Sequence, residues 1–237
     1  MKTKIYTDMT KKMFTLALVA LLLPMSMMAQ AYKSSRYYNK NTGRLEYSNR
    51  STMYQPGQNY YGLRLGPAFS KVNSDDKKLD GGNWQTGLNL GAVAGFSLSD
   101  SFPLFLEGGA FYTEKGGKTN YQGKKMTYNL NYLEVPVAVK YAIQMDDEHV
   151  SIQPFMGVYV ACGISGKTKI YDDREAHSSF SDDYFQRFDG GLRMGCGFAY
   201  DMFYVELAYD LGLTNICHDE FDASHNHSLQ LNVGVNF

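Results

Sequence analysis

The sequence predicts an all-β fold, an eight-stranded antiparallel up-and-down transmembrane β-barrel. The chain has 237 residues, with 19 Tyr, 14 Phe and 23 Gly against only 6 Pro. Aromatic residues favour pleated strands and Gly favours the turns between them. Eight segments alternate apolar and polar residues, and the connections between them alternate in length. Membrane barrels have this loop asymmetry, and an even strand number places both chain ends on the side of the short turns.

Alternation is clearest at the C-terminus. There Leu229, Leu231, Val233, Val235 and Phe237 share one face, and Ser228, Gln230, Asn232, Gly234 and Asn236 share the other. The eight segments cover residues 61–70, 88–98, 104–112, 133–141, 152–164, 188–198, 203–213 and 228–237. The two faces differ in this way along each segment, which is the pattern of a strand with one face in an apolar medium.

The connections give a second reason for the membrane assignment. Long connections are expected at residues 71–86, 114–127, 166–186 and 215–227, and tight turns near Asp100-Ser101, Asp146-Asp147-Glu148 and Asp201-Met202. The alternative is a secreted barrel of the lipocalin kind, which is polar outside and apolar inside. Here the polar set is rich in Gly, Ala and Ser, which suit a narrow interior, and the bulky set is apolar. The pattern favours the membrane barrel.

Residues 1–31 have the features of a secretory signal peptide. Four lysines precede the apolar run at residues 14–23, and Ala29-Gln30-Ala31 offers the small residues of a cleavage site. The run is too short to span a bilayer as a helix. Residues 32–58 show no clear period and are expected to form a polar periplasmic lead-in or a partial plug, and residues 59–237 are expected to form the barrel. We therefore expect a bacterial outer-membrane location.

Several residues carry a family resemblance. The run NYLEVPVAVKY at residues 131–141, the run FDGGLRMG at residues 188–195 and the terminal Phe237 are similar to the PorT-like outer-membrane β-barrel family, small barrels of the OmpA and OmpX type. The resemblance covers about residues 58–237. It implies that Phe237 is the signal read by the outer-membrane assembly machinery. It also implies, by analogy with a family component associated with secretion, a role as an accessory subunit of an envelope complex.

The inward face of the predicted strands collects charged residues. The predicted lumen network consists of Arg64, Glu107, Glu134, Lys140, Asp189, Arg193, Glu206 and Asp210. Buried charges must pair, so a closed, salt-bridged interior is expected. The alternative is a narrow solute channel lined by Arg and Glu.

Other chemistry has weaker support in the sequence. His218, His225 and His227 are candidate metal ligands in the last long connection, and His177 with Asp172, Asp173 and Asp182 could form a barrel-mouth hydrolase. His225 and His227 are two residues apart and could face one ion in an extended segment, but a solvated polar loop provides no fixed scaffold for a metal. No spacing supports the hydrolase. We therefore expect no catalytic residues, no metal and no cofactor. The formal net charge of −1 and the lack of a basic block exclude nucleic acid. The expected partners are outer-membrane lipid, the assembly machinery and an envelope protein, and the expected function is a structural or interaction module that presents surface loops.

Overall fold

The computed structural model describes residues 36–39, 44–47, 54, 56–74, 83–121, 124–145, 150–170, 176–180, 185–216 and 224–237. The chain divides into two units, Met1–Arg50 and Ser51–Phe237. In the first unit, β1 (Arg36–Asn39) and β2 (Arg44–Tyr47) pair as a short antiparallel hairpin. The sequence shows no clear period here, because strands of four residues are too short to show one. Among the described residues, no helix is long and apolar enough to cross a membrane.

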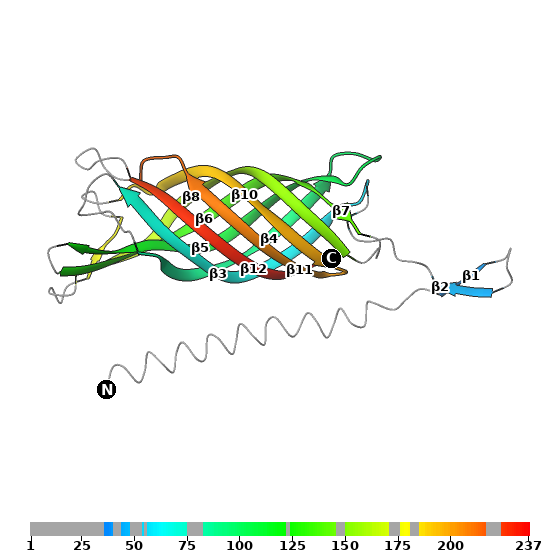
Figure 1. The fold of residues 1–237 in the computed structure, drawn as a ribbon, viewed down its shortest axis with the longest axis horizontal. Helices are drawn as coiled ribbons and strands as arrows, with labels where there is room; N and C mark the ends of the chain where they lie inside the picture. The colour runs from blue at the N-terminus through cyan, green and yellow to red at the C-terminus, as the bar shows by residue number, and fades with distance from the viewer. Residues whose placement is uncertain are drawn as a thin grey trace, which may run out of the picture. The chain divides into compact units, whose positions relative to one another are not determined.

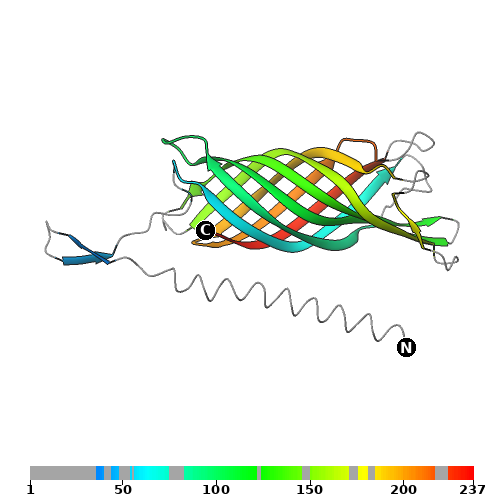
Figure 2. The ribbon, with the colours of Figure 1, turned by 180° about the vertical axis from the view of Figure 1, so that it is seen from behind.

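The second unit is a closed antiparallel barrel, which confirms the predicted fold (Figure 1). Its wall has eight strands: β3 (Tyr60–Ser74), β4 (Gln85–Ser97), β5 (Leu104–Tyr121), β6 (Lys124–Tyr141), β8 (Val150–Ile170), β10 (Phe188–Tyr200), β11 (Phe203–Gly212) and β12 (Ser224–Asn236). Neighbours along the chain pair in order, β12 pairs with β3, and β10 pairs with β8. Figure 2 shows the opposite side of this wall. Because the described sheet closes on itself, every wall strand has a partner on both sides.

Two short strands lie outside this order. β7 (Ile143–Gln144) follows β6 and pairs with the start of β8, and β9 (Ala176–Ser178) pairs with the far end of β8. The turn from β10 to β11 is at Asp201 and Met202, as predicted, and Asp201 adopts a positive φ of 49°. The predicted turn at Asp146-Asp147-Glu148 lies outside the described residues.

One predicted connection is wrong. Residues 114–127 were expected to form a long loop, yet β5 continues to Tyr121 and β6 starts at Lys124. The strands here carry polar residues on their outward face, because that part of the wall needs no apolar surface. The alternating pattern therefore ends before the strands do. In the same way β8 continues to Ile170 and β12 begins at Ser224, inside the predicted connections at 166–186 and 215–227.

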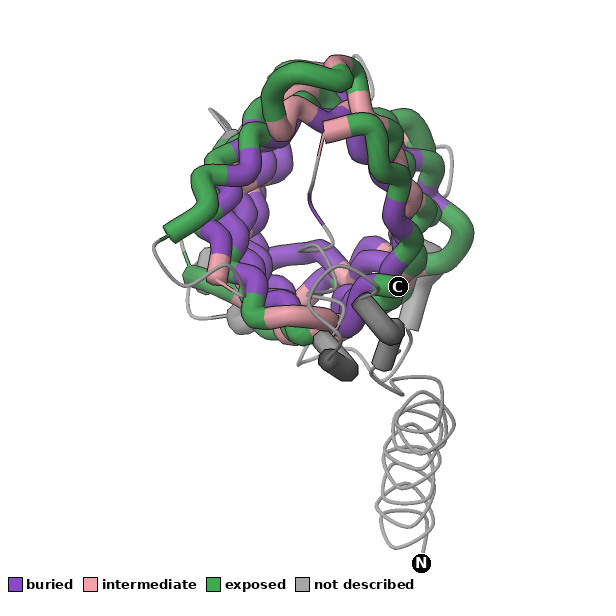
Figure 3. Tube along the Cα trace, turned by 90° about the vertical axis from the view of Figure 1, so that its right-hand side faces the viewer, coloured by how far each residue is buried: buried purple, intermediate pink, exposed green. Residues whose placement is uncertain are grey.

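Burial alternates along the strands, as Figure 3 shows in a view along the barrel. On β11 the side chains of Tyr204, Glu206 and Ala208 are buried, and those of Val205 and Leu207 are exposed. Large apolar side chains cover the outward face, and both described cysteines, Cys162 and Cys196, lie on it as free thiols. An apolar exterior of this extent needs an apolar medium around it.

Glycines make room for aromatic rings inside the wall. The ring of Tyr204 lies against Gly197 on β10, so closely that a Cβ at this position would be 2.0 Å from the Tyr204 hydroxyl oxygen. Gly95 on β4 accommodates the ring of Tyr60 in the same way. The narrow interior thus holds large aromatic side chains, because the neighbouring strand has a glycine, which lacks a side chain, beside each ring.

The depth dependence of a charged substitution tests the lipid-facing surface. Leu207 is half exposed in the middle of β11 and is paired with Cys196 and Leu231. We expect Leu207→Arg to lower the free energy of unfolding in vesicles by about 2–4 kcal/mol. Leu213 follows the end of β11, so the control Leu213→Arg should lower the free energy of unfolding by only about 0–1 kcal/mol. Equal effects in equilibrium denaturant unfolding would contradict the proposed orientation.

Candidate functional site

The interior of the described barrel holds nine buried charged side chains. They are Arg64 on β3, Glu107 and Lys115 on β5, Glu134 and Lys140 on β6, Asp189 and Arg193 on β10, and Glu206 and Asp210 on β11. Eight of them are the residues of the lumen network expected from the sequence, and the structure places all eight inside the wall. The ninth, Lys115, was missed because it falls in the segment that was expected to be a loop.

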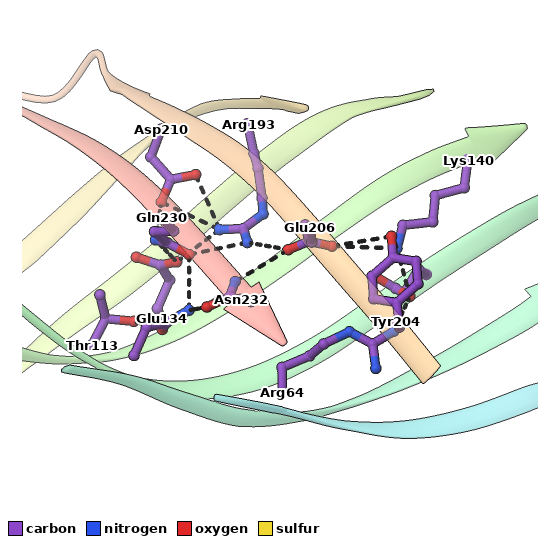
Figure 4. Close-up of polar contacts among 12 residues, drawn as sticks. Arg64, Thr113, Glu134, Lys140, Arg193, Tyr204, Glu206, Asp210, Gln230 and Asn232 are labelled. Carbon is purple, nitrogen blue, oxygen red and sulfur yellow. Dashed lines mark hydrogen bonds and ion pairs between the residues drawn. The ribbon is translucent and has the colours of Figure 1, made fainter. Parts of the chain in front are cut away.

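Arg193 lies at the centre of this group (Figure 4). Its Nη1 atom donates to Asp210 at 3.1 Å and to Glu134 at 3.2 Å, and its Nη2 atom donates to Glu206 at 3.2 Å and to Gln230 at 3.1 Å. One guanidinium therefore joins three carboxylates. Its planar set of donors suits this role better than a single ammonium group does.

Lys115 connects Arg193's partners to the end of the barrel where the long connections lie. Its Nζ atom is 2.7 Å from Glu134 and 3.3 Å from Asp189, and it lies 4.2 Å from the centre of the Tyr159 ring. Asp189 also accepts hydrogen bonds from the Tyr159 hydroxyl at 3.3 Å and from the Asn226 amide at 3.0 Å. This ammonium is fully buried, and two carboxylates and a ring face replace its lost hydration.

Lys140 organises the end where the short turns lie. Its Nζ atom is 2.9 Å from Glu107, 2.6 Å from the Tyr204 hydroxyl and 3.5 Å from Glu206. The Tyr60 hydroxyl donates to Glu107 at 2.7 Å. The guanidinium of Arg64 stacks 4.0 Å from the centre of the Tyr204 ring. Glu206 contacts both Lys140 and Arg193, so it links the two halves of the network.

Neutral side chains extend these contacts across the barrel. The Asn89 amide on β4 donates to Gln230 and to Asn232 on β12, each at 2.9 Å, and accepts from Thr113 at 2.8 Å. Gln230 in turn donates to Asp210 at 2.6 Å. The sequence placed Gln230 and Asn232 on the polar face of the last strand, but it contained no signal for their partners.

Two aromatic clusters enclose the charged layer. At the short-turn end, Tyr54, Tyr60, Phe105, Ala142, Ala199 and Tyr204 pack together. At the other end, Val72, Tyr128, Leu130, Tyr132, Tyr159, Ala161, Phe180, Phe185 and Ile216 pack together. The charged side chains therefore lie between two apolar layers, and all of them except Glu107 are at most 3% exposed.

Tyr54 contributes to the short-turn cluster from the segment predicted as a lead-in. Its ring packs edge-on against Tyr60 at 5.0 Å and Phe105 at 6.1 Å, and its hydroxyl contacts the Asn236 side chain. Burial raises the pKa of Tyr54 to about 12, so the phenol stays neutral. At least this residue of the lead-in therefore packs into the end of the barrel.

Two of the three candidate metal ligands lie in a described strand. His225 and His227 lie in β12 rather than in a loop: His225 contacts the carbonyl oxygen of Thr214 at 3.0 Å, and His227 contacts the Tyr209 hydroxyl at 3.1 Å. His218 lies outside the described residues. Within the described part of the chain no group of three or more His, Cys, Asp or Glu side chains is arranged to hold a metal ion.

The proposed hydrolase residues are largely outside the described part of the chain. This applies to Asp172, Asp173, Asp182 and the His177 side chain; the backbone of His177 belongs to β9.

The terminal Phe237 is half exposed, and its backbone exchanges two hydrogen bonds with Tyr61 of β3 at 2.8 and 2.9 Å.

A closed eight-stranded barrel with an apolar exterior and a paired polar interior defines an outer-membrane β-barrel protein. Comparison with family models agrees with this class. Residues 29–218 match the outer membrane protein beta-barrel domain, and the chain belongs to this family. A search of curated proteins found no match.

Solved structures of small outer-membrane barrels are similar to this chain. Ail, the attachment invasion locus protein of Yersinia pestis, is 17% identical, with 77% of this chain and 100% of that chain covered and a TM-score of 0.42. A major outer membrane protein from Thermus thermophilus is 15% identical, with 76% and 99% covered and a TM-score of 0.47. Outer membrane protein W of E. coli is 11% identical, with 78% and 100% covered and a TM-score of 0.41.

Removal of the central cation tests the network. Arg193→Met leaves Glu134, Glu206 and Asp210 without their shared partner, so we expect the free energy of unfolding to fall by about 3–5 kcal/mol. The double variant Arg193→Met/Asp210→Asn should recover part of this loss, because it also removes one of the uncompensated carboxylates. Denaturant unfolding in vesicles measures both effects, and a loss below about 1 kcal/mol for the single variant would show that these contacts do not stabilise the barrel.

Proposed function

We propose that this protein is a non-enzymatic outer-membrane barrel with a closed interior, which acts through the surfaces that it presents outside the membrane. The observation that carries the proposal is the burial of the charged side chains that a pore would expose. Glu134, Asp189 and Asp210 are 0% exposed, and Arg193 is 3% exposed. Water in a conducting pathway would contact these groups. Barrels of eight strands are narrow enough for side chains to fill them.

The same proposal covers the processing and partners of the chain. Residues 1–31 are removed as a signal peptide, residues 32–58 form a lead-in to the barrel, and residues 59–237 form the membrane domain. The assembly machinery recognises the terminal Phe237, whose half-exposed ring makes it accessible. The resemblance to the PorT-like family supports a role as an accessory subunit of an envelope or secretion complex. The strands that continue beyond the apolar exterior offer a surface for such a partner.

Conductance distinguishes this function from a solute channel. The purified, folded barrel should give no stepwise current in a planar bilayer, because the paired charges and the aromatic clusters fill the interior. Folding is checked by the difference in gel mobility before and after boiling. Stepwise conductance whose size changes in Arg64→Gln or Glu206→Gln would establish a channel and overturn the closed interior.

A partner is tested in the native membrane. The tagged protein is extracted in mild detergent, and an unrelated outer-membrane barrel treated in the same way is the control. We expect a reproducible, stoichiometric envelope protein to co-purify with this chain and not with the control, as identified by mass spectrometry. Purification of the barrel alone, with no such partner, would contradict a role as an accessory subunit.

A further inference from the structure

Three strands of the wall are much longer than the others. β5 and β6 have 18 residues each and β8 has 21, whereas the remaining wall strands have 10 to 15. The β5–β6 hairpin projects beyond its neighbours at the long-connection end of the barrel (Figure 1). This extension is a sheet with its own two faces, and β9 adds a short strand to it.

The outward face of this sheet changes character abruptly. On β6 the outward residues are apolar as far as Leu133, and Asn131 and Asn129 follow. On β8 the exposed Ile164 is followed by the exposed Lys167. The polar part of the outward face is therefore continuous with the apolar surface that contacts lipid and lies directly beyond it.

The strand register shows which positions share this polar face. Residues directly opposite each other in adjacent strands point to the same side of a sheet. Lys118 is paired with Thr127, which is paired with Lys169. Asn120 is paired with Lys125, and Asn129 with Lys167. Positions 118, 125, 167 and 169 thus occupy one face, which we call the lysine face.

The strand segments that carry these lysines contain no acidic residue. The sequence contains no Asp or Glu at residues 115–133 or 149–171. The nearest acidic residue on the outward face of β5 is Glu114, which is only partly exposed. It already accepts hydrogen bonds from the backbone NH of Leu88 at 3.0 Å and from the Tyr112 hydroxyl at 3.2 Å. Along these stretches of β5, β6 and β8 the charged residues of the sequence are therefore all basic.

Trp84 lies next to the residue that pairs with Lys118 of the lysine face. Asn83 bridges to Lys118, and the next residue, Trp84, is 46% exposed. The Nζ atom of Lys71 lies 5.5 Å from the centre of the Trp84 ring. Tryptophan is enriched at the boundary between hydrocarbon and headgroups. Lys118 therefore neighbours a residue type that anchors barrels at the headgroup level.

We propose that the lysine face binds the phosphate groups of anionic lipids in the surrounding leaflet. Charge complementarity, continuity with the lipid-facing surface and the adjacent Trp84 all favour a lipid phosphate over a soluble anion. Ammonium groups bind phosphate as point charges, and each lysine near an anionic surface adds to the attraction. This inference does not depend on a closed interior or on a protein partner.

The test compares lipid selectivity between variants of the full chain. The protein is reconstituted in phosphatidylcholine bilayers containing a minor fraction of phosphatidylglycerol and extracted in mild detergent, and the retained lipids are quantified by native mass spectrometry. The variant Lys118→Gln/Lys125→Gln/Lys167→Gln/Lys169→Gln should retain less anionic lipid, by about 10-fold or more. Arginine at the same four positions should preserve retention. The control Lys77→Gln/Lys78→Gln, which changes lysines between β3 and β4, should behave as the wild type.

Three results would overturn the proposal. One is unchanged retention in the four-fold glutamine variant. Another is lysine-dependent binding of inorganic polyphosphate that displaces the phosphatidylglycerol retained from the mixed bilayer, which would assign the face to a soluble polyanion. The third is a loss of unfolding stability in neutral detergent without a change in lipid retention, which would show that the lysines pair within the chain. If the four-fold variant does not fold, Lys118→Gln/Lys167→Gln provides the same comparison.

Discussion

The structure depends on one constraint: charged side chains inside a closed, narrow wall must find their partners across the barrel. The wall faces an apolar medium on the outside, and two aromatic clusters enclose the interior. Arg193 satisfies this constraint for three carboxylates at once, from β6 and β11. An interior charge without such a partner would carry most of its desolvation cost. The inward residues therefore depend on one another in a way that the outward residues do not.

This difference assigns separate roles to the two faces of each strand. Outward apolar residues such as Val205 and Leu207 can be exchanged for other apolar residues, because lipid does not distinguish between them. The inward residues are specific: moving β11 by one residue would place Glu206 on the outside and leave Lys140 and Arg193 without it. The apolar exterior stabilises the barrel in the membrane, while the interior contacts determine the register of the strands. Gly95 and Gly197 support the same register, since a side chain at either position would collide with the ring of Tyr60 or Tyr204.

The sequence predicts the features that follow from alternation alone. It gives the strand number, the inward positions of Arg64, Glu134 and Glu206, and the turn at Asp201. It does not give the partner of any charge, because partners such as Lys115 and Asp189 are 74 residues apart and are related only by closure of the sheet. It also fails where a strand leaves the lipid. Lys115 and His227 lie in the parts of their strands where the outward residues are polar, so the signal that identifies a membrane strand is absent there.

Lys115 and Lys118 show how closely the two kinds of surface approach each other. They are three residues apart on β5, yet Lys115 is fully buried between two carboxylates, and Lys118 is exposed in a stretch of sequence, residues 115–133, that contains no acidic residue. The same side chain therefore stabilises the interior at one position and presents charge to the surroundings at the other. Because the interior charged groups form ion pairs with one another, they are poorly placed to bind another molecule. Recognition is better served by the extended parts of β5, β6 and β8, where polar groups are no longer needed to fill the barrel.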